Sequence, residues 1–330
     1  MINHTRNYLF LLFFISSIFA NFGKNIVQYD EFNWSFIQTK HFNIYYYNLN
    51  KDQAELAAYN SEKAYKKIEK LLGWGLSKRS DIFVYSSHND FQQTNIVDIY
   101  LEEGIGGVTE LMKNRMVIPF DGSLEEFNHV IYHELVHVFI NDGVYGGSIM
   151  AALKNRVVIP LWMNEGLAEY LASDWDANSD MWLRDLVINS DQIPDIPYLN
   201  GMLAYRGGQS VWQFITDKWG DEIIADIFYS IKSKKNVNKG IEASLNINIK
   251  ELSKQWHQYI KKIYWSDIEL RDDIREIGFP LTNHIESYTT YNIGSEVSPN
   301  QLQVAMYSNK NGVMSIYLIS LESGEIIKKI

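Results

Sequence analysis

The stretch HVIYHELVHVFIND, residues 129 to 142, places two histidines four residues apart, with a glutamate directly after His133. On a helix, residues i and i+4 share one face, so His133 and His137 can offer ring nitrogens to one metal ion. A catalytic zinc site needs three protein ligands and one open position. Glu134 lies beside the first ligand, where a carboxylate can accept a proton from water at the metal. A chain of this length can contain this pattern by chance, so the residues around it decide whether it is a metal site.

A third ligand is offered by WMNEGLAEY, in which Glu165 stands 28 residues beyond His137. A lone carboxylate in so apolar a helix is costly to bury unless it pairs or binds a metal. Glu169 is four residues further on the same face and can accept the free ring N–H of a ligand histidine; the alternative is an exposed helix acid. His129 is four residues before His133, but three residues over two turns span about 12 Å and cannot surround one ion. We therefore assign His129 a structural role.

Several elements are predicted to position these residues. Ser123 and Glu126 form an S-x-x-E capping box that begins the helix of the first motif, and Gly143 ends it. Pro160 opens the helix of the second motif. In the strand predicted at 114–120, Pro119 favours an edge position, where the strand can pair with an extended substrate. Other strands are expected within 32–47 and at 81–87, and helices at 51–72, 209–219, 221–230 and 249–265, which gives an α+β fold.

Composition and the N-terminus bear on where the protein acts. Residues 1–20 carry Arg6 and then an uncharged apolar run, which predicts a signal peptide; an uncleaved anchor is the alternative. No later stretch is apolar enough to span a membrane, so an exported protein, periplasmic or extracellular, is expected. The net charge of -10 without a basic cluster argues against a nucleic-acid partner. With no cysteine, any metal must be held by His, Asp and Glu.

The sequence changes character after Ser266. Residues 267–284 are charged and contain Pro280, as expected for a linker. Three strand-like runs follow at 302–308, 314–320 and 325–330, separated by NKNG and ESG turns. Three runs are fewer than a finished propeller blade contains, and the last ends within a strand-like segment, so we expect the sequence to be part of a longer protein.

HELVH followed by NEGLAEY resembles the gluzincins, zinc peptidases of the thermolysin type, and within them the peptidase-MA-like branch. The resemblance covers about residues 30–266 and implies a thermolysin-like metallopeptidase domain, which we place at 21–266, with a zinc helix and a helical C-terminal part. By this resemblance His133, His137 and Glu165 bind one Zn2+ per chain and Glu134 is the base. Residues 285–330 resemble the first, incomplete repeat of a TolB-like β-propeller, which in complete form could bind partners.

The gluzincin aminopeptidases have two further elements for comparison. Their Tyr-x-Lys-Gly stretch supplies a tyrosine hydroxyl that stabilises the tetrahedral intermediate; MLAYRGGQSVWQFI is similar in Tyr205 and Gly208, with Gly207 in place of the lysine. Their Gly-x-Met-Glu-Asn element grips the substrate amino terminus. Here the corresponding GIGGVTEL lacks Met-Glu-Asn, so Glu110 is not an equivalent residue and endopeptidase action is favoured over aminopeptidase.

The expected function is thus an exported zinc peptidase that hydrolyses peptide or protein substrates, with Glu134 and Tyr205 as catalytic residues. Two alternatives remain open at this point. The first is an exported binding or scaffold protein whose peptidase-like domain supports a propeller; an intact Glu134 argues against it. The second is a zinc hydrolase of a non-peptide bond, which would use the same residues.

Overall fold

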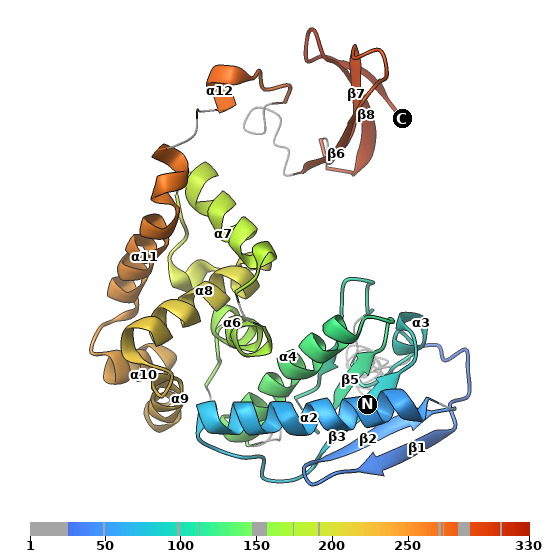
Figure 1. Ribbon diagram of the computed structural model, residues 1–330, viewed down its shortest axis with the longest axis vertical. Coiled ribbons are helices and arrows are strands. Elements are labelled where there is room, and N and C mark those ends of the chain that lie inside the picture. Colours follow the sequence, from blue (N-terminus) through green and yellow to red (C-terminus); the bar gives the residue numbers. More distant parts are fainter. Residues whose placement is uncertain are drawn as a thin grey trace, which may run out of the picture. The chain divides into compact units, whose positions relative to one another are not determined.

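The structure is a computed structural model that describes residues 26–48, 50–97, 100–111, 113–146, 157–173, 175–190, 192–269, 272, 274–282, 291–310 and 312–330. The chain divides into two compact units, Met1–Tyr264 and Trp265–Ile330, and Figure 1 shows the elements of each. The predicted signal peptide lies outside the described residues and stays a prediction. Among the helices of the described ranges, none has the length and apolar character needed to cross a membrane.

A five-stranded sheet with the order β1-β2-β3-β5-β4 forms the first part of the larger unit. Its centre is parallel, with β2 beside β3 and β3 beside β5, while β1 and β4 run antiparallel at the two edges. The strands are β1 (Trp34–Gln38), β2 (Phe42–Tyr47), β3 (Ser80–Tyr85), β4 (Val108–Thr109) and β5 (Met116–Pro119), and α3 (His88–Phe91) follows β3.

The prediction that Pro119 places its strand at an edge is wrong. β5 lies between β3 and β4, and the edge is the two-residue strand β4. The proline is tolerated because β4 pairs with β5 only at Met116 and Val117. On the other side, the next residue, Phe120, donates its N–H to the carbonyl of Tyr85 in β3 at 2.8 Å. No ladder hydrogen bond is therefore lost at Pro119.

Two helices cover one face of this sheet. α2 (Lys51–Leu72) has its predicted bounds and ends at Gly73, which adopts a left-handed conformation with φ 77°. Four of its nine buried residues are alanines: Ala54, Ala57, Ala58 and Ala64. α4 (Leu124–Gly143) begins at the predicted cap, where the Ser123 side chain accepts the N–H of Glu126 at 3.2 Å. Apolar residues of α2, α4 and the sheet share one core.

The rest of the larger unit is helical. It contains two helices that the sequence did not predict, α7 and α10, and α8 begins seven residues before the predicted start at Gln209. Buried tryptophans connect the helices: Trp212 donates its ring N–H to the carbonyl of Met163, and Trp256 donates to the hydroxyl of Ser210. The elements are α6 (Leu161–Ala172), α7 (Ala177–Asn189), η1 (Ile196–Tyr198), α8 (Met202–Trp219), α9 (Ile223–Lys234), α10 (Val237–Leu245) and α11 (Ile249–Glu269), of which residues 265–269 belong to the smaller unit.

The smaller unit contains a four-stranded antiparallel sheet in the order β6-β7-β8-β9. The prediction of three strands was one too few, because β6 (Asn292–Val297) was not recognised. One face is buried through Val304, Met306, Tyr317 and Ile319. The remaining elements of this unit are α12 (Ile274–Ile277), β7 (Gln303–Ser308), β8 (Ser315–Ser320) and β9 (Ile326–Lys329).

Candidate metal and catalytic site

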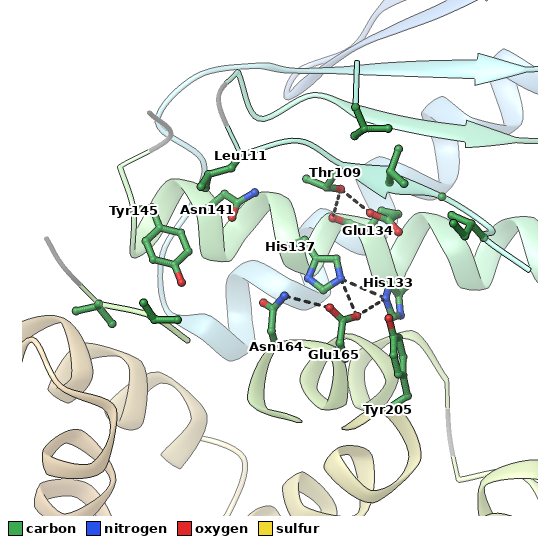
Figure 2. A pocket seen from close by; sticks show the side chains of 16 residues that line it. Thr109, Leu111, His133, Glu134, His137, Asn141, Tyr145, Asn164, Glu165 and Tyr205 are labelled. Atoms are coloured by element: carbon green, nitrogen blue, oxygen red, sulfur yellow. Dashed lines mark hydrogen bonds and ion pairs between the residues drawn. The ribbon is translucent and has the colours of Figure 1, made fainter. Parts of the chain in front are cut away.

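Three of the predicted site residues meet where α4 and α6 pack together. His133 and His137 lie one turn apart on α4, and Glu165 faces them from α6 (Figure 2). The Nε2 atoms of the two histidines are 3.2 Å apart. Oε2 of Glu165 is 3.2 Å from Nε2 of His133 and 3.3 Å from Nε2 of His137. Three ligand atoms of the types that zinc prefers thus form a nearly equilateral triangle.

The size of this triangle fits a tetrahedral zinc ion. Ligand atoms at 2.0–2.1 Å from a tetrahedral centre are about 3.3–3.4 Å apart, close to the 3.2–3.3 Å found here. The three residues also line a cavity of about 970 Å³, so a fourth position faces open space. His133, His137 and Glu165 can therefore hold a metal ion with one position left for water or substrate.

Glu169, the residue predicted to orient a ligand histidine, lies behind His133. Its Oε1 is 2.9 Å from Nδ1 of His133, on the side of the ring away from Glu165. Its Oε2 accepts a hydrogen bond from the Arg206 guanidinium at 2.5 Å. His129, predicted to be structural, has its Nε2 3.4 Å from Oε1 of Glu169. These contacts fix the orientation of the His133 ring on its Nδ1 side.

His129, His133 and Glu169 form a second group whose ligand atoms lie within 4.8 Å of one another. This group is a poorer metal site than the first. His129 and Glu169 do not line the cavity, and Arg206 already supplies a positive charge to the Glu169 carboxylate. A catalytic metal needs an accessible position, which the group of His133, His137 and Glu165 provides.

The site concentrates negative charge around the histidines. Burial lowers the pKa of His133, but the carboxylates of Glu165 and Glu169 outweigh it and raise this pKa to about 10. Burial raises the pKa of Glu165, but hydrogen bonds from His133 and His137 outweigh it and hold this pKa well below its usual range. The Glu165 carboxylate therefore stays ionised and can attract a cation to the Nε2 atoms of His133 and His137.

Glu134 is almost fully buried, with 6% of its surface exposed, and its carboxylate is held by a residue that the sequence did not reveal. The hydroxyl of Thr109, in the edge strand β4, donates to Oε2 of Glu134 at 2.6 Å. Gly107 lies against the same side chain: a Cβ at this position would be 2.9 Å from Cγ of Glu134. The only signal for this contact in the sequence is the Gly-rich stretch before Thr109, residues 104–107.

Tyr205 lies on the first turns of α8, with its ring nearly parallel to that of His133 and the ring centroids 6.1 Å apart. Figure 2 shows it beside His133 and Glu165 at the margin of the cavity. Burial, followed by the charges of Glu165 and Glu134, raises the pKa of Tyr205. Its hydroxyl is therefore a neutral hydrogen-bond donor at neutral pH.

A glycine-to-glycine contact brings Tyr205 to this place. α6 and α8 cross where Gly166, directly after Glu165, meets Gly208, three residues after Tyr205. A Cβ on Gly208 would lie 2.4 Å from the carbonyl oxygen of Trp162 and 2.9 Å from Cα of Gly166. Only glycines allow the two backbones to come this close. The glycines of the two motifs thus set the separation between Tyr205 and α6, the helix that carries Glu165.

Two other carboxylates near the motifs, Glu110 and Asp142, form contacts away from the cavity. Glu110 is buried and forms an ion pair with Arg115, and it does not line the cavity. Asp142, near the end of α4, accepts hydrogen bonds from the backbone N–H of Ser77 at 2.8 Å and from its hydroxyl at 2.6 Å. Asp142 therefore anchors the segment that follows α2.

Comparison with known proteins gives one family match. Residues 60–262 match the Peptidase MA superfamily. Among solved structures, those of an M1 zinc metallopeptidase from Deinococcus radiodurans and of a mutant of it are similar, with TM-scores of 0.38 and 0.40. Each is 12% identical and covers 68% of this chain, which spans about half (51%) of theirs. The comparison with curated proteins finds no match.

Proposed function

Because this chain belongs to the Peptidase MA superfamily, we propose that it is a zinc-dependent peptidase in which His133, His137 and Glu165 hold the metal. The observation that carries the proposal is the triangle of ligand atoms 3.2–3.3 Å apart at the wall of a cavity. The buried carboxylate of Glu134 lies next to that triangle. A hydrolytic zinc site requires these components together.

The proposed mechanism assigns a role to each residue. A zinc ion held by His133, His137 and Glu165 would be a Lewis acid that could polarise the scissile carbonyl and lower the pKa of a water molecule. Glu134 accepts a proton from the attacking water and returns it to the leaving amine. Tyr205, a neutral phenol, donates a hydrogen bond to the carbonyl oxygen as charge develops there. Glu169 keeps the His133 ring oriented through Nδ1.

We further propose that the substrate is cleaved within the chain, not from its free amino terminus. An aminopeptidase needs a carboxylate to bind the terminal ammonium group. Among the described residues that line the cavity, Glu134 and Glu165 are the only carboxylates, and both have other roles. Glu110 is paired with Arg115. The other described lining residues are mostly apolar, which favours uncharged substrate side chains: Val97, Ile105, Val108, Leu111, Tyr145, Val157 and Val158.

We also propose that the protein is exported and that its smaller unit contains a β-propeller repeat. The apolar run within residues 1–20 supports export to the periplasm or the extracellular space. The four antiparallel strands of the smaller unit equal the number in a propeller blade, which supports a TolB-like repeat within 285–330. In this proposal residues 21–266 form the peptidase domain, and 267–284 connect it to the blade, which could bind a partner when further blades are present.

The test measures the zinc content of the purified protein together with its rate of peptide hydrolysis. Purified protein should contain one zinc per chain and cleave peptides in a reaction that a chelator abolishes. N-acetylated peptides should be cleaved as well as free ones, because cleavage is internal. Glu134→Gln should keep the zinc and lose about 10²–10⁴-fold in rate, since only the proton acceptor is removed. Glu125→Gln, an exposed acid in the first turn of α4, is the matched control and should be fully active.

Either of two results would reject this function. The first is a protein that binds one zinc per chain but cleaves no peptide in a chelator-sensitive reaction. The protein would then be a binding protein or a hydrolase of another bond. A fully active Glu134→Gln variant would reject the proposed mechanism even if the protein cleaves peptides.

A further inference from the structure

The general base has two oxygens, and the contacts around it distinguish them. Oε2 of Glu134 accepts the hydroxyl of Thr109 at 2.6 Å. The same hydroxyl is 3.2 Å from the backbone carbonyl oxygen of Glu134. A hydroxyl has one proton to donate, and an ionised carboxylate at the shorter distance is the stronger acceptor. Within the described ranges no hydrogen bond is donated to Oε1, so this oxygen is left for the water.

Gly107 borders the other oxygen. A Cβ at this position would lie 3.2 Å from Oε1 and 2.9 Å from Cγ of Glu134. The backbone of Gly107 is not among the glycines with positive φ, so a side chain is conformationally allowed there. A Cβ at Gly107 would also lie 2.8 Å from Cγ1 of Val130, so Glu134 and Val130 together leave no space for a side chain at this position. The neighbouring Gly106 has no contact with Glu134, because a Cβ there would meet only a methyl group of Val130, at 3.0 Å.

From these two contacts we propose that Thr109 is a positioning residue for the general base, and that Gly107 assists it. Thr109 anchors Oε2 and thereby directs Oε1 toward the attacking water. The terminal torsion of a glutamate is broad and roughly two-fold, so an unanchored carboxylate rotates through unproductive orientations. General base catalysis depends on an oxygen within hydrogen-bonding distance of the proton that it accepts. This inference rests on the proposed function, because it concerns the same base.

A structural role for Thr109 makes different predictions from a positioning role. If Thr109 only satisfied a buried carboxylate or joined β4 to α4, its loss would lower stability and zinc content together with activity. If it positions the base, its loss lowers kcat while KM and zinc content stay unchanged. Substrate affinity and metal affinity do not depend on which carboxylate oxygen faces the water.

The experiment uses the full chain loaded with zinc and a fluorogenic peptide that the wild type cleaves. Thr109→Val keeps the shape of the side chain and removes the hydroxyl. We expect kcat to fall about 10–100-fold with KM and zinc content unchanged. The melting temperature should fall only by the loss of one hydrogen bond to a buried carboxylate. Thr109→Ser restores the hydroxyl and should recover most of the lost rate. Gly107→Ala should lower kcat similarly, whereas Gly106→Ala, the matched control, should not.

Several results would overturn the inference. One is a Thr109→Val variant with the kcat of the wild type. Another is a Thr109→Ser variant as slow as Thr109→Val, since the hydroxyl would then not be responsible. A third is a further loss of rate when Thr109→Val is added to Glu134→Gln, because a residue that acts through the base has no effect once the base is gone. If the wild type itself shows no chelator-sensitive cleavage, the proposed function fails before these variants are compared.

Discussion

Replacing Gly208 by alanine should separate the fold from the placement of Tyr205. The added Cβ would be 2.4 Å from the carbonyl oxygen of Trp162, whereas ordinary contact begins at 3.4 Å. α8 must therefore move away from α6 by about 1 Å, the difference between these two distances. Tyr205 lies one turn from Gly208 on the same helix and moves with it. Because Glu165 is on α6, the metal ligands should keep their positions.

The magnitudes follow from this displacement. Overpacking of this kind costs about 1–3 kcal/mol, and replacing a helical glycine by alanine returns about 0.5–1 kcal/mol, so the net loss of stability is about 0–2.5 kcal/mol. A catalytic group displaced by about 1 Å can cost on the order of 10²-fold in rate. We therefore expect kcat to fall about 10²-fold with stoichiometric zinc, in a protein that is still folded.

Gly207→Ala is the matched control. It lies on the same helix with the same gain in helix propensity, and its Cβ would only touch methyl groups of Leu199 at 3.4 Å. It should be at least as stable as the wild type and fully active. The measurements are peptide hydrolysis, zinc by mass spectrometry and the melting temperature. The reasoning fails if Gly208→Ala keeps the wild-type kcat, or if it slows a Tyr205→Phe variant that has already lost the hydroxyl.

Two other substitutions test the ligand set and the cavity. His137→Ala should lose most of its zinc, whereas His129→Ala on the same helix should keep it; the opposite result would favour the group of His129, His133 and Glu169 as the metal site. Leu111→Lys places a cation at the cavity wall, where 39% of the leucine surface is exposed, and should shift cleavage toward peptides with acidic residues near the scissile bond. Leu124→Lys, an exposed leucine outside the cavity, should leave the preference unchanged; an equal shift in both variants would indicate a nonspecific charge effect.

The parts of the site that could be predicted depend on geometry within one helix. His133 and His137 share a face of α4, and Glu165 and Glu169 share a face of α6, because residues four apart do so on any helix. The cap at Ser123 is similarly local, and the structure confirms it. Such inferences need no knowledge of how the helices pack.

The parts that were missed depend on contacts between distant segments. Thr109 reaches Glu134 from a strand 25 residues away, and only the pairing of β4 with β5 brings it there. The edge prediction for Pro119 failed for the same reason, because nothing in the proline shows that a neighbouring strand stops two residues earlier. β6 escaped recognition because Gly294 has a positive φ of 61° and a register shift between Ile293 and Glu296 interrupts its alternation.

The arrangement around His133 shows why one side of its ring suits a metal and the other does not. α6 places a carboxylate on each side of the imidazole, with Glu165 near Nε2 and Glu169 near Nδ1. Arg206 supplies a cation to Glu169, so the charge on that side is already compensated and the carboxylate orients the ring. Glu165 has no comparable guanidinium among the described contacts and faces the cavity. The uncompensated charge therefore lies where His133 and His137 converge, and this is where a divalent cation would be attracted most strongly.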